Sequence, residues 1–303
     1  MVLFSPSRQM LGLFGYDLFL PNSIQFITRL SSYHSMLCRL PTESTNYIFL
    51  WILYIILHCH FSTFSYQMAY EEAVLMSRFN HPNVIYLHEC FITDRILCIV
   101  MEYAMGGTLE EFLRKKGGKL LSQTEVVYMF SQMVHGLHYI HQRGVVHRDI
   151  KPSNILLTPV GVEIVVKIAD FGLSKIFKSR KTEFTSVLGT PSYLAPELCE
   201  GQSYNKETDI WALGCVLYEM MTLKKAFGAE TLGSIVRKIL QCQFVPPNPQ
   251  KYGEHLRQLL YCLLRIDPTC RPSTQMIMAD VAITEMCHKL TVNLGLVPSS
   301  HKT

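Results

Sequence analysis

The sequence predicts an α+β domain with two lobes, because a few short strands come first and a large helical part follows. The strand signals are short β-branched and apolar runs, which lie at 84–87, 96–101, 155–157 and 165–168. The helix signals are apolar residues at helical spacing, which continue after Asp209 over 210–222, 232–241, 254–264 and from 273. Strands followed by helices, rather than alternating with them, are typical of an α+β arrangement.

The first predicted elements are a helix and a hairpin. The stretch 71–78 has a helical pattern and ends before His81-Pro82, where the proline disfavours continuation. The runs 84–87 and 96–101 flank the polar stretch Thr93-Asp94-Arg95. Two apolar runs around a polar turn indicate an antiparallel hairpin.

Two capping boxes mark the helices that come next. Thr108-x-x-Glu111 begins a short helix that ends near Gly117-Gly118, and Ser122-x-x-Glu125 begins a longer one. Gly144 follows the longer helix in the C′ position, where a left-handed backbone is common. The local signals therefore define both helices at each end.

Composition excludes several classes of protein. The formal charge of +4 and the lack of a long Lys/Arg block predict no nucleic-acid interface. No pair of cysteines has C-x-x-C spacing, so we expect neither a zinc site nor a disulfide framework, but reduced thiols in a cytosolic protein. The ten cysteines are Cys38, Cys59, Cys90, Cys98, Cys199, Cys215, Cys242, Cys262, Cys270 and Cys287.

Residues 1–70 differ from the rest of the chain, since they hold three arginines, two acidic residues and no lysine. An apolar run at 47–57 extends to an uncharged stretch at 47–66, which polar residues dilute. A membrane helix needs about twenty apolar residues, and the arginines before the run would export everything after it, so we do not expect a span. Three interpretations stay open: a non-native N-terminus, a structural extension of the domain, and a membrane anchor.

Three short motifs carry the chemistry. They are the run from Val146 to Asn154, which reads VHRDIKPSN, then Asp170-Phe171-Gly172, then Ala195-Pro196-Glu197. Any one of them arises easily by chance, but their order and spacing together match the motif set of phosphoryl-transfer enzymes.

The residue types in these motifs suit that reaction. Asp149 is a carboxylate that can orient an attacking hydroxyl and accept its proton. Asn154 and Asp170 supply oxygen ligands, which Mg²⁺ prefers. Lys151 supplies a positive charge for the transferred phosphoryl group.

The chain resembles the eukaryotic protein kinases over about residues 71–280, and its Lys151 and the run Gly189-Thr190-Pro191-Ser192-Tyr193 are typical of the Ser/Thr branch. Within that branch it is most similar to the NIMA-related (Nek) family. The resemblance is carried by 101–113 (MEYAMGGTLEEFL), 189–201 (GTPSYLAPELCEG) and 204–220 (YNKETDIWALGCVLYEM). It implies a truncated small lobe, an intact and mainly helical large lobe, ATP and Mg²⁺ as cofactors, and protein substrates with Ser or Thr hydroxyls.

The resemblance also implies roles for residues around the nucleotide. Met101 is expected as the gatekeeper behind adenine, and Glu102 and Ala104 as the hinge whose backbone pairs with the adenine edge. Leu156 and Ala169 would line the pocket, although Leu156 also suits a purely structural core position.

Further roles lie in the large lobe. Thr190 would hydrogen-bond to Asp149 and Lys151. Asp209 would hold the backbone of the loop around His147. The resemblance further implies a buried ion pair between Glu197 and Arg271. Residues 175–189 would form the activation loop, in which Thr185 and Ser186 are candidate phosphorylation sites, and a solvated loop without phosphorylation is the alternative.

The front of the expected ATP site is missing from the sequence. No G-x-G-x-x-G loop precedes Gly106, and the first lysine in the chain is Lys115. Glu72, at the position of the αC glutamate, therefore has no lysine partner. We accordingly divide the chain into an atypical segment (1–70), a kinase domain without the Gly-rich loop and strand-3 lysine (71–283) and a tail (284–303).

Two functions from different classes follow. The first is a Ser/Thr protein kinase, and the alternative is a catalytically impaired kinase-fold binding module. A membrane-anchored scaffold is a third and weaker option. The family resemblance implies a cytoplasmic location, with centrosome and cilium as addresses linked to the family, and nothing in the sequence indicates an oligomeric state.

Overall fold

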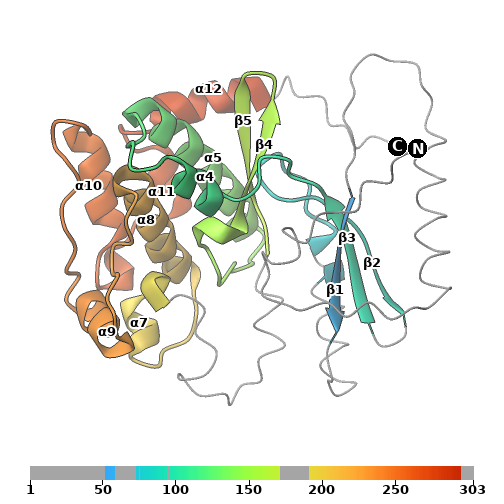
Figure 1. Cartoon of the computed structure of the whole chain (residues 1–303), viewed down its shortest axis with the longest axis horizontal. Coiled ribbons are helices and arrows are strands. Elements are labelled where there is room, and N and C mark those ends of the chain that lie inside the picture. The colour runs from blue at the N-terminus through green and yellow to red at the C-terminus, as the bar shows by residue number, and fades with distance from the viewer. Residues whose placement is uncertain (1–51, 59–72, 75, 94–95, 171–190, 295–303) are drawn as a thin grey trace. The chain divides into compact units, whose positions relative to one another are not determined.

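The architecture is taken from a computed structural model of the chain (Figure 1). It describes residues 52–58, 73–74, 76–93, 96–170 and 191–294. Glu72, Phe171, Thr190 and the predicted activation loop lie outside these residues.

A three-stranded antiparallel sheet contains the predicted hairpin. Its strands are β1 (Ile52–His58), β2 (Leu87–Thr93) and β3 (Ile96–Glu102), in the order β1-β3-β2. Most of the apolar run at 47–57 therefore lies in a strand. In its pairing with β3, Ile52 is opposite Glu102 and His58 is opposite Ile96. This pairing covers the edge of β3 that the hairpin alone would leave open. Among the residues that the structure describes, no helix is long and apolar enough to cross a membrane.

The predicted bounds of the first hairpin strand, 84–87, are wrong. Val84 makes an isolated parallel bridge to Ile168 instead, and the strand itself begins at Leu87. Ile85 N donates to Ile168 O at 2.9 Å, and Ile168 N donates to Asn83 O at 2.9 Å. The apolar residues were identified correctly, but the backbone hydrogen bonds of this stretch go to Ile168, far along the chain.

The second sheet is a hairpin of β4 (Ile155–Val160) and β5 (Glu163–Ile168), which confirms the two later strand predictions. It lies against the chain that follows β3, because Gly106 N donates to Leu157 O and Leu157 N donates to Gly107 O. Gly106 has no room for a side chain, since an added Cβ would lie 2.5 Å from Leu157 O. Backbone contacts therefore hold β4 directly against this loop.

Most helices follow the predicted starts and stops closely, but α8 begins at Lys206 instead of 210, and the helix predicted from 273 is two helices, α11 and α12. Thr108 caps α4 (Leu109–Lys115), and Ser122 with Glu125 forms the complete capping box of α5 (Gln123–Gln142). Gly144 has φ 74° after α5, as the C′ position requires. The later helices are α7 (Pro196–Cys199), α8 (Lys206–Thr222), α9 (Leu232–Leu240), α10 (Glu254–Leu263), α11 (Thr274–Met278) and α12 (Thr284–Leu294).

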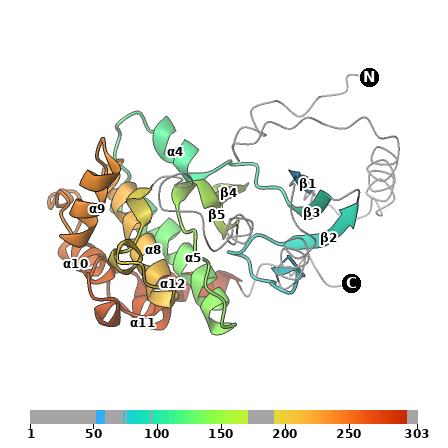
Figure 2. The same ribbon diagram turned by 90° about the horizontal axis from the view of Figure 1, so that it is seen from below.

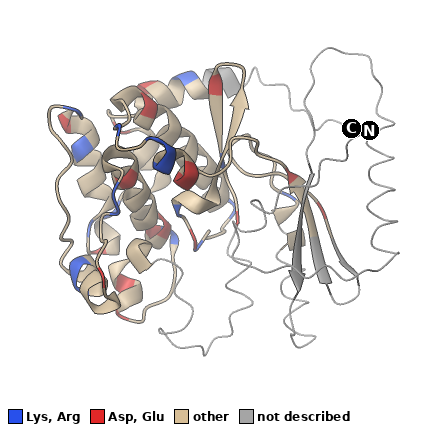
Figure 3. Ribbon diagram, in the orientation of Figure 1, with Lys and Arg blue, Asp and Glu red and all other residues tan. Residues whose placement is uncertain are grey.

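The core of the helical part is built around α8, which is buried along most of its length. α8 packs against α5 and α10 and lies between them (Figure 2). Three short 3₁₀ helices, η2 (Pro152–Asn154), η3 (Pro191–Tyr193) and η4 (Pro268–Cys270), complete the part of the chain that is described. Basic and acidic residues are interspersed over the helices (Figure 3).

Candidate active site

Asp209, in the first turn of α8, holds the loop that carries Asp149. Its side chain is 1% exposed, and its two carboxylate oxygens accept from His147 N at 2.8 Å and from Arg148 N at 2.9 Å. The ring of His141 lies 2.8 Å from the same carboxylate. Buried backbone donors need a partner, and Asp209 supplies one to two successive residues. The role expected for Asp209 is therefore present in the structure.

Arg148 has a left-handed backbone with φ 70°. A non-glycine residue in this region costs on the order of 1–3 kcal/mol and persists only where its surroundings determine it. The hydrogen bonds to Asp209 supply that restraint. The strained turn directs the chain into Asp149.

Lys151 and Asn154 both contact the same carboxylate oxygen of Asp149. Lys151 Nζ lies 2.7 Å from Asp149 Oδ2, and Asn154 Nδ2 donates to the same oxygen at 3.0 Å. Asn154 Nδ2 also donates to the backbone oxygen of Asp149 at 2.9 Å. The structure thus brings together three of the predicted catalytic residues, on the loop before η2 and on η2 itself.

Asp170 follows β5 and is placed by its neighbour Ala169. Ala169 N donates to Asn154 O at 2.9 Å, and the ring Nε2 of His147 lies 3.1 Å from Ala169 O. Asp170 itself has φ 58°, a second strained non-glycine position at the site. Asn154 and Asp170 are the two predicted metal ligands. Ala169 connects them, because its backbone N–H donates to Asn154 O and it directly precedes Asp170.

The predicted hinge leaves the end of β3. Met101 and Ala104 are buried, and Leu156 of β4 is half-buried against the same apolar core. Thr108 bridges to Leu156, so the chain after the hinge is tied to the strand that was expected to line the pocket. Ala169 is also buried in this core.

The side chain of Glu102 has a role that the sequence did not predict. Its Oε1 accepts from Tyr86 N at 2.7 Å and lies 2.8 Å from Lys167 Nζ. One carboxylate thus connects the segment before β2, the end of β3 and β5. A signal for this contact was the charged Lys167 within the otherwise apolar run Ile164–Ile168.

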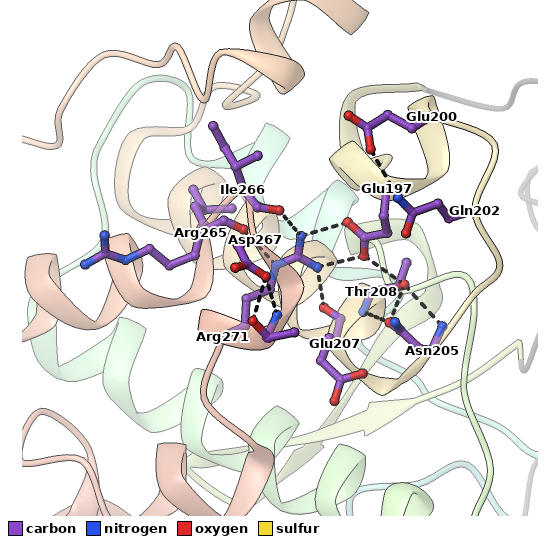
Figure 4. Close-up of polar contacts among 12 residues, drawn as sticks. Glu197, Glu200, Gln202, Asn205, Glu207, Thr208, Arg265, Ile266, Asp267 and Arg271 are labelled. Atoms are coloured by element: carbon purple, nitrogen blue, oxygen red, sulfur yellow. Dashed lines mark hydrogen bonds and ion pairs between the residues drawn. The ribbon is translucent and has the colours of Figure 1, made fainter.

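The expected ion pair between Glu197 and Arg271 is present and buried (Figure 4). It is bidentate, with Arg271 Nη1 and Nη2 lying 2.8 and 2.7 Å from the two oxygens of Glu197. Thr208 of α8 donates to Glu197 as well, at 3.0 Å. Burial alone would raise the pKa of Glu197, but the hydrogen bonds from Arg271 and Thr208 outweigh it and lower that pKa. The Ala-Pro-Glu motif is therefore anchored to the helical part.

A further contact, between the partly buried side chains of Tyr193 and Glu219, was missed by sequence reasoning. Tyr193 Oη donates to Glu219 Oε2 at 2.5 Å. Burial and then the charge of Glu219 raise the pKa of Tyr193, and burial raises the pKa of Glu219. The signal was a lone carboxylate in the apolar stretch of α8.

Comparison with known proteins agrees with this geometry. The chain matches the protein kinase domain family over residues 57–282, so it belongs to the protein kinases. It is 42% identical over 229 residues to the serine/threonine-protein kinase Nek8 of Danio rerio, which covers 76% of this chain and 32% of that protein. It is 38% identical over 249 residues to Nek5 of Homo sapiens, covering 78% of this chain and 35% of that protein.

The chain is a member of the NIMA-related branch of the Ser/Thr protein kinases, as the resemblance predicted. It spans about a third of the length of the two relatives named above. The protein kinase family as a whole uses ATP and a divalent metal. The family match begins at residue 57, and the proposed division at residues 70 and 71 stays a prediction.

Proposed function

We propose that this chain is a protein serine/threonine kinase, which transfers the γ-phosphate of ATP to Ser or Thr hydroxyls of proteins. The observation that carries the proposal is the convergence of Lys151 and Asn154 on the Asp149 carboxylate, at 2.7 and 3.0 Å. A carboxylate held in this way suits the positioning of a hydroxyl nucleophile.

Each residue of the cluster has a separate task in the proposal. Asp149 orients the substrate hydroxyl and accepts its proton as the new P–O bond forms, while the bond between the γ-phosphorus and the bridging oxygen breaks and ADP leaves. Lys151, beside it, balances negative charge on the phosphoryl oxygens. Asp209 acts through the backbone of His147 and Arg148 and is a positioning residue.

The residues present fit a magnesium ion. Asn154 turns its amide nitrogen toward Asp149, so the other end of the amide is an oxygen, and Asp170 adds a carboxylate. Magnesium is usually held by one or two carboxylates together with substrate phosphates. When bound, it would supply positive charge to the phosphate oxygens. Met101, Glu102, Ala104, Leu156 and Ala169 are proposed to contact the adenine end of ATP.

A kinase-fold binding module is the alternative raised by the sequence, which contains no lysine before Lys115. The intact set of Asp149, Lys151, Asn154 and Asp170 favours the enzyme, as does membership of the family. A module selected only for binding would have no need of a proton acceptor. Thr190 completes the predicted catalytic set, and its contacts lie outside the described residues.

The test is incorporation of labelled phosphate from Mg·ATP into casein and into the purified chain itself. We expect Asp149→Asn to lower incorporation by about a hundredfold or more, because it removes the proton acceptor. Asp280→Asn, the same change away from the site, should leave the rate unchanged. Equal incorporation by wild type and Asp149→Asn would refute the proposal. A rise in melting temperature with Mg·ATP but no incorporation would favour the binding module.

The family resemblance extends the proposal to a cytoplasmic location, with the centrosome and cilium as specific addresses. Fluorescence microscopy of the tagged chain with centrosomal and ciliary markers tests it. Co-sedimentation with membranes after a high-salt wash would instead support the membrane anchor.

A further inference from the structure

One lysine, Lys167, lies within the apolar run 164–168 of β5. Its side chain is only 12% exposed, and its Nζ lies 2.8 Å from Oε1 of Glu102, whose side chain is 21% exposed. A cation that is largely removed from water is costly unless it is paired. This pair therefore differs from Glu285–Lys289 on α12, whose side chains are 82% and 61% exposed.

Glu102, at the end of β3, is held by its side chain and by its backbone. Its Oε1 accepts from Tyr86 N at 2.7 Å, and its own N donates to Tyr86 O at 3.0 Å. The contact of Lys167 with the same carboxylate oxygen adds β5 to this connection. The residue whose backbone is proposed to meet the adenine edge is thus tied to two segments from elsewhere in the chain.

The strand β5 leads from Lys167 toward Asp170, the proposed metal ligand. The backbone of Ile168 bonds in both directions with the segment before β2, at 2.9 Å each. Ala169 N donates to Asn154 O at 2.9 Å, and Asp170 follows directly. Three residue steps, about 10 Å at the rise of a strand, therefore separate the contact with Glu102 from Asp170.

Lys167 also lies on the face of the β4–β5 hairpin that carries the proposed pocket. In the register of the hairpin it is opposite Leu156, which is proposed to line the adenine pocket. Opposed residues of an antiparallel pair share a face of the sheet. The ion pair between Glu102 and Lys167 therefore borders the adenine end of the proposed nucleotide site.

We propose that Lys167 and the carboxylate of Glu102 are positioning residues, whose ion pair fixes the spacing between the two ends of the nucleotide site. One end is the hinge, where adenine is proposed to bind. The other end is Asp170, where the metal and the phosphates are proposed to bind. The inference rests on the proposed function and deepens it, since it assigns this spacing to two side chains that act without touching the reacting atoms.

A fixed spacing favours a ligand that occupies both ends at once. Such a ligand gains from preorganisation, because less entropy is lost in bringing the two ends into register. A ligand that occupies one end gains nothing from the spacing. Mg·ATP spans both ends, whereas adenosine reaches only the hinge, so the ion pair should matter for Mg·ATP and not for adenosine.

Calorimetric titration of the full chain with Mg·ATP and with adenosine measures both cases. We expect Lys167→Met to raise the Kd of Mg·ATP about tenfold, a usual size for coupling between groups in contact, and the Kd of adenosine by less than about twofold. Glu102→Gln should act alike, because its amide oxygen can still accept from Tyr86 N. Lys289→Met, the same change in the exposed pair on α12, should leave both affinities unchanged.

The double variant Glu102→Gln/Lys167→Met distinguishes a shared role from two independent ones. If the two residues act as one unit, the double variant binds Mg·ATP about as weakly as either single variant. A loss equal to the product of the two single losses would overturn the inference, as would an equal loss of affinity for adenosine and Mg·ATP.

The same titrations separate this inference from the proposed function. Equal Kd values of Mg·ATP for wild type and Lys167→Met would refute the positioning role and leave the proposed function intact. A wild-type chain that binds no Mg·ATP would refute the proposed function, and the inference with it. Retained binding of adenosine shows that the variants are folded.

Discussion

The catalytic loop and the three-stranded sheet are held together by different forces. Around Asp149, buried polar groups such as Asp209 fix individual backbone donors at 2.8 and 2.9 Å. In the sheet, β1 joins β3 through a regular ladder of seven opposed pairs, and all but one of the β1 residues belong to the apolar run at 47–57. Loss of a single polar atom can therefore displace the loop, whereas the stability of the ladder is spread over many residues. The proposed phosphoryl transfer depends on the first kind of contact, and the proposed nucleotide binding depends on the second.

The largest effect is expected from Arg271→Ala. The change leaves Glu197 buried beside Thr208 without its bidentate partner. Removing one member of a buried ion pair costs about 3–5 kcal/mol. Urea unfolding measures the loss, with Arg237→Ala as the exposed control. A loss below about 1 kcal/mol, the range of surface pairs, would contradict the structural role.

We expect the second largest effect from Asp209→Asn. Asparagine has one amide oxygen in place of two carboxylate oxygens, so one of the two backbone donors would face an amide nitrogen. We expect a loss of stability of about 1–3 kcal/mol for the unsatisfied group, together with a fall in kinase activity. Unfolding and phosphate incorporation are measured in parallel. The matched control is Asp267→Asn, whose carboxylate contacts only its own turn. Activity that is retained while stability falls would show that Asp209 does not position the loop.

Replacing one residue of β1 by lysine tests whether a positive charge on the sheet is enough to strengthen ATP binding. Ile55 is opposite Ile99 in the β1–β3 register, and Tyr54 is opposite Val100. Opposed residues share a face and alternate residues return to it, so position 55 belongs to the face of Ile99 and Met101. We expect Ile55→Lys to tighten ATP binding by about tenfold, since a charge-assisted contact is worth that much. Calorimetry measures the affinity, and Tyr54→Lys is the control on the other face. Equal tightening by both lysines would assign the gain to net charge.

The smallest expected effect is a loss of folding stability at acidic pH. Burial, and then the charge of His135, lower the pKa of His81 from 6.5 to about 4. The unfolded chain therefore binds the proton first, and stability is lost as the pH falls from about 6.5 toward 4. We expect a loss of about 1 kcal/mol between about pH 7 and pH 5 that is absent in His81→Asn, whose side chain can still accept from Asn83 N. His255→Asn, on the exposed part of α10, should keep the wild-type profile. An identical profile in His81→Asn would assign the acid loss to other groups.

Local signals were enough to predict much of the molecule. The Thr108 cap of α4, the capping box of α5, the turn at Gly144 and the hairpin of β4 and β5 depend on residues a few positions apart, so the sequence alone contains both partners of each contact. The predicted return contact from Glu111 to the Thr108 backbone is not among the contacts of the α4 cap. The Asp149, Lys151 and Asn154 cluster is local for the same reason. The Glu197–Arg271 pair is distant in the chain, and it was predictable only through the resemblance to a known family.

Only the tertiary structure decided which partner each long-range contact takes. The sequence left three interpretations open for the segment that contains the apolar run at 47–57, and pairing with β3 made residues 52–58 a strand. The partners of Lys167 and Glu219, which are Glu102 and Tyr193, became evident only in the fold. The sequence by itself determined most of the later elements and the family. The packing determined the partners, because burial and hydrogen bonding between distant segments depend on the whole arrangement of the chain.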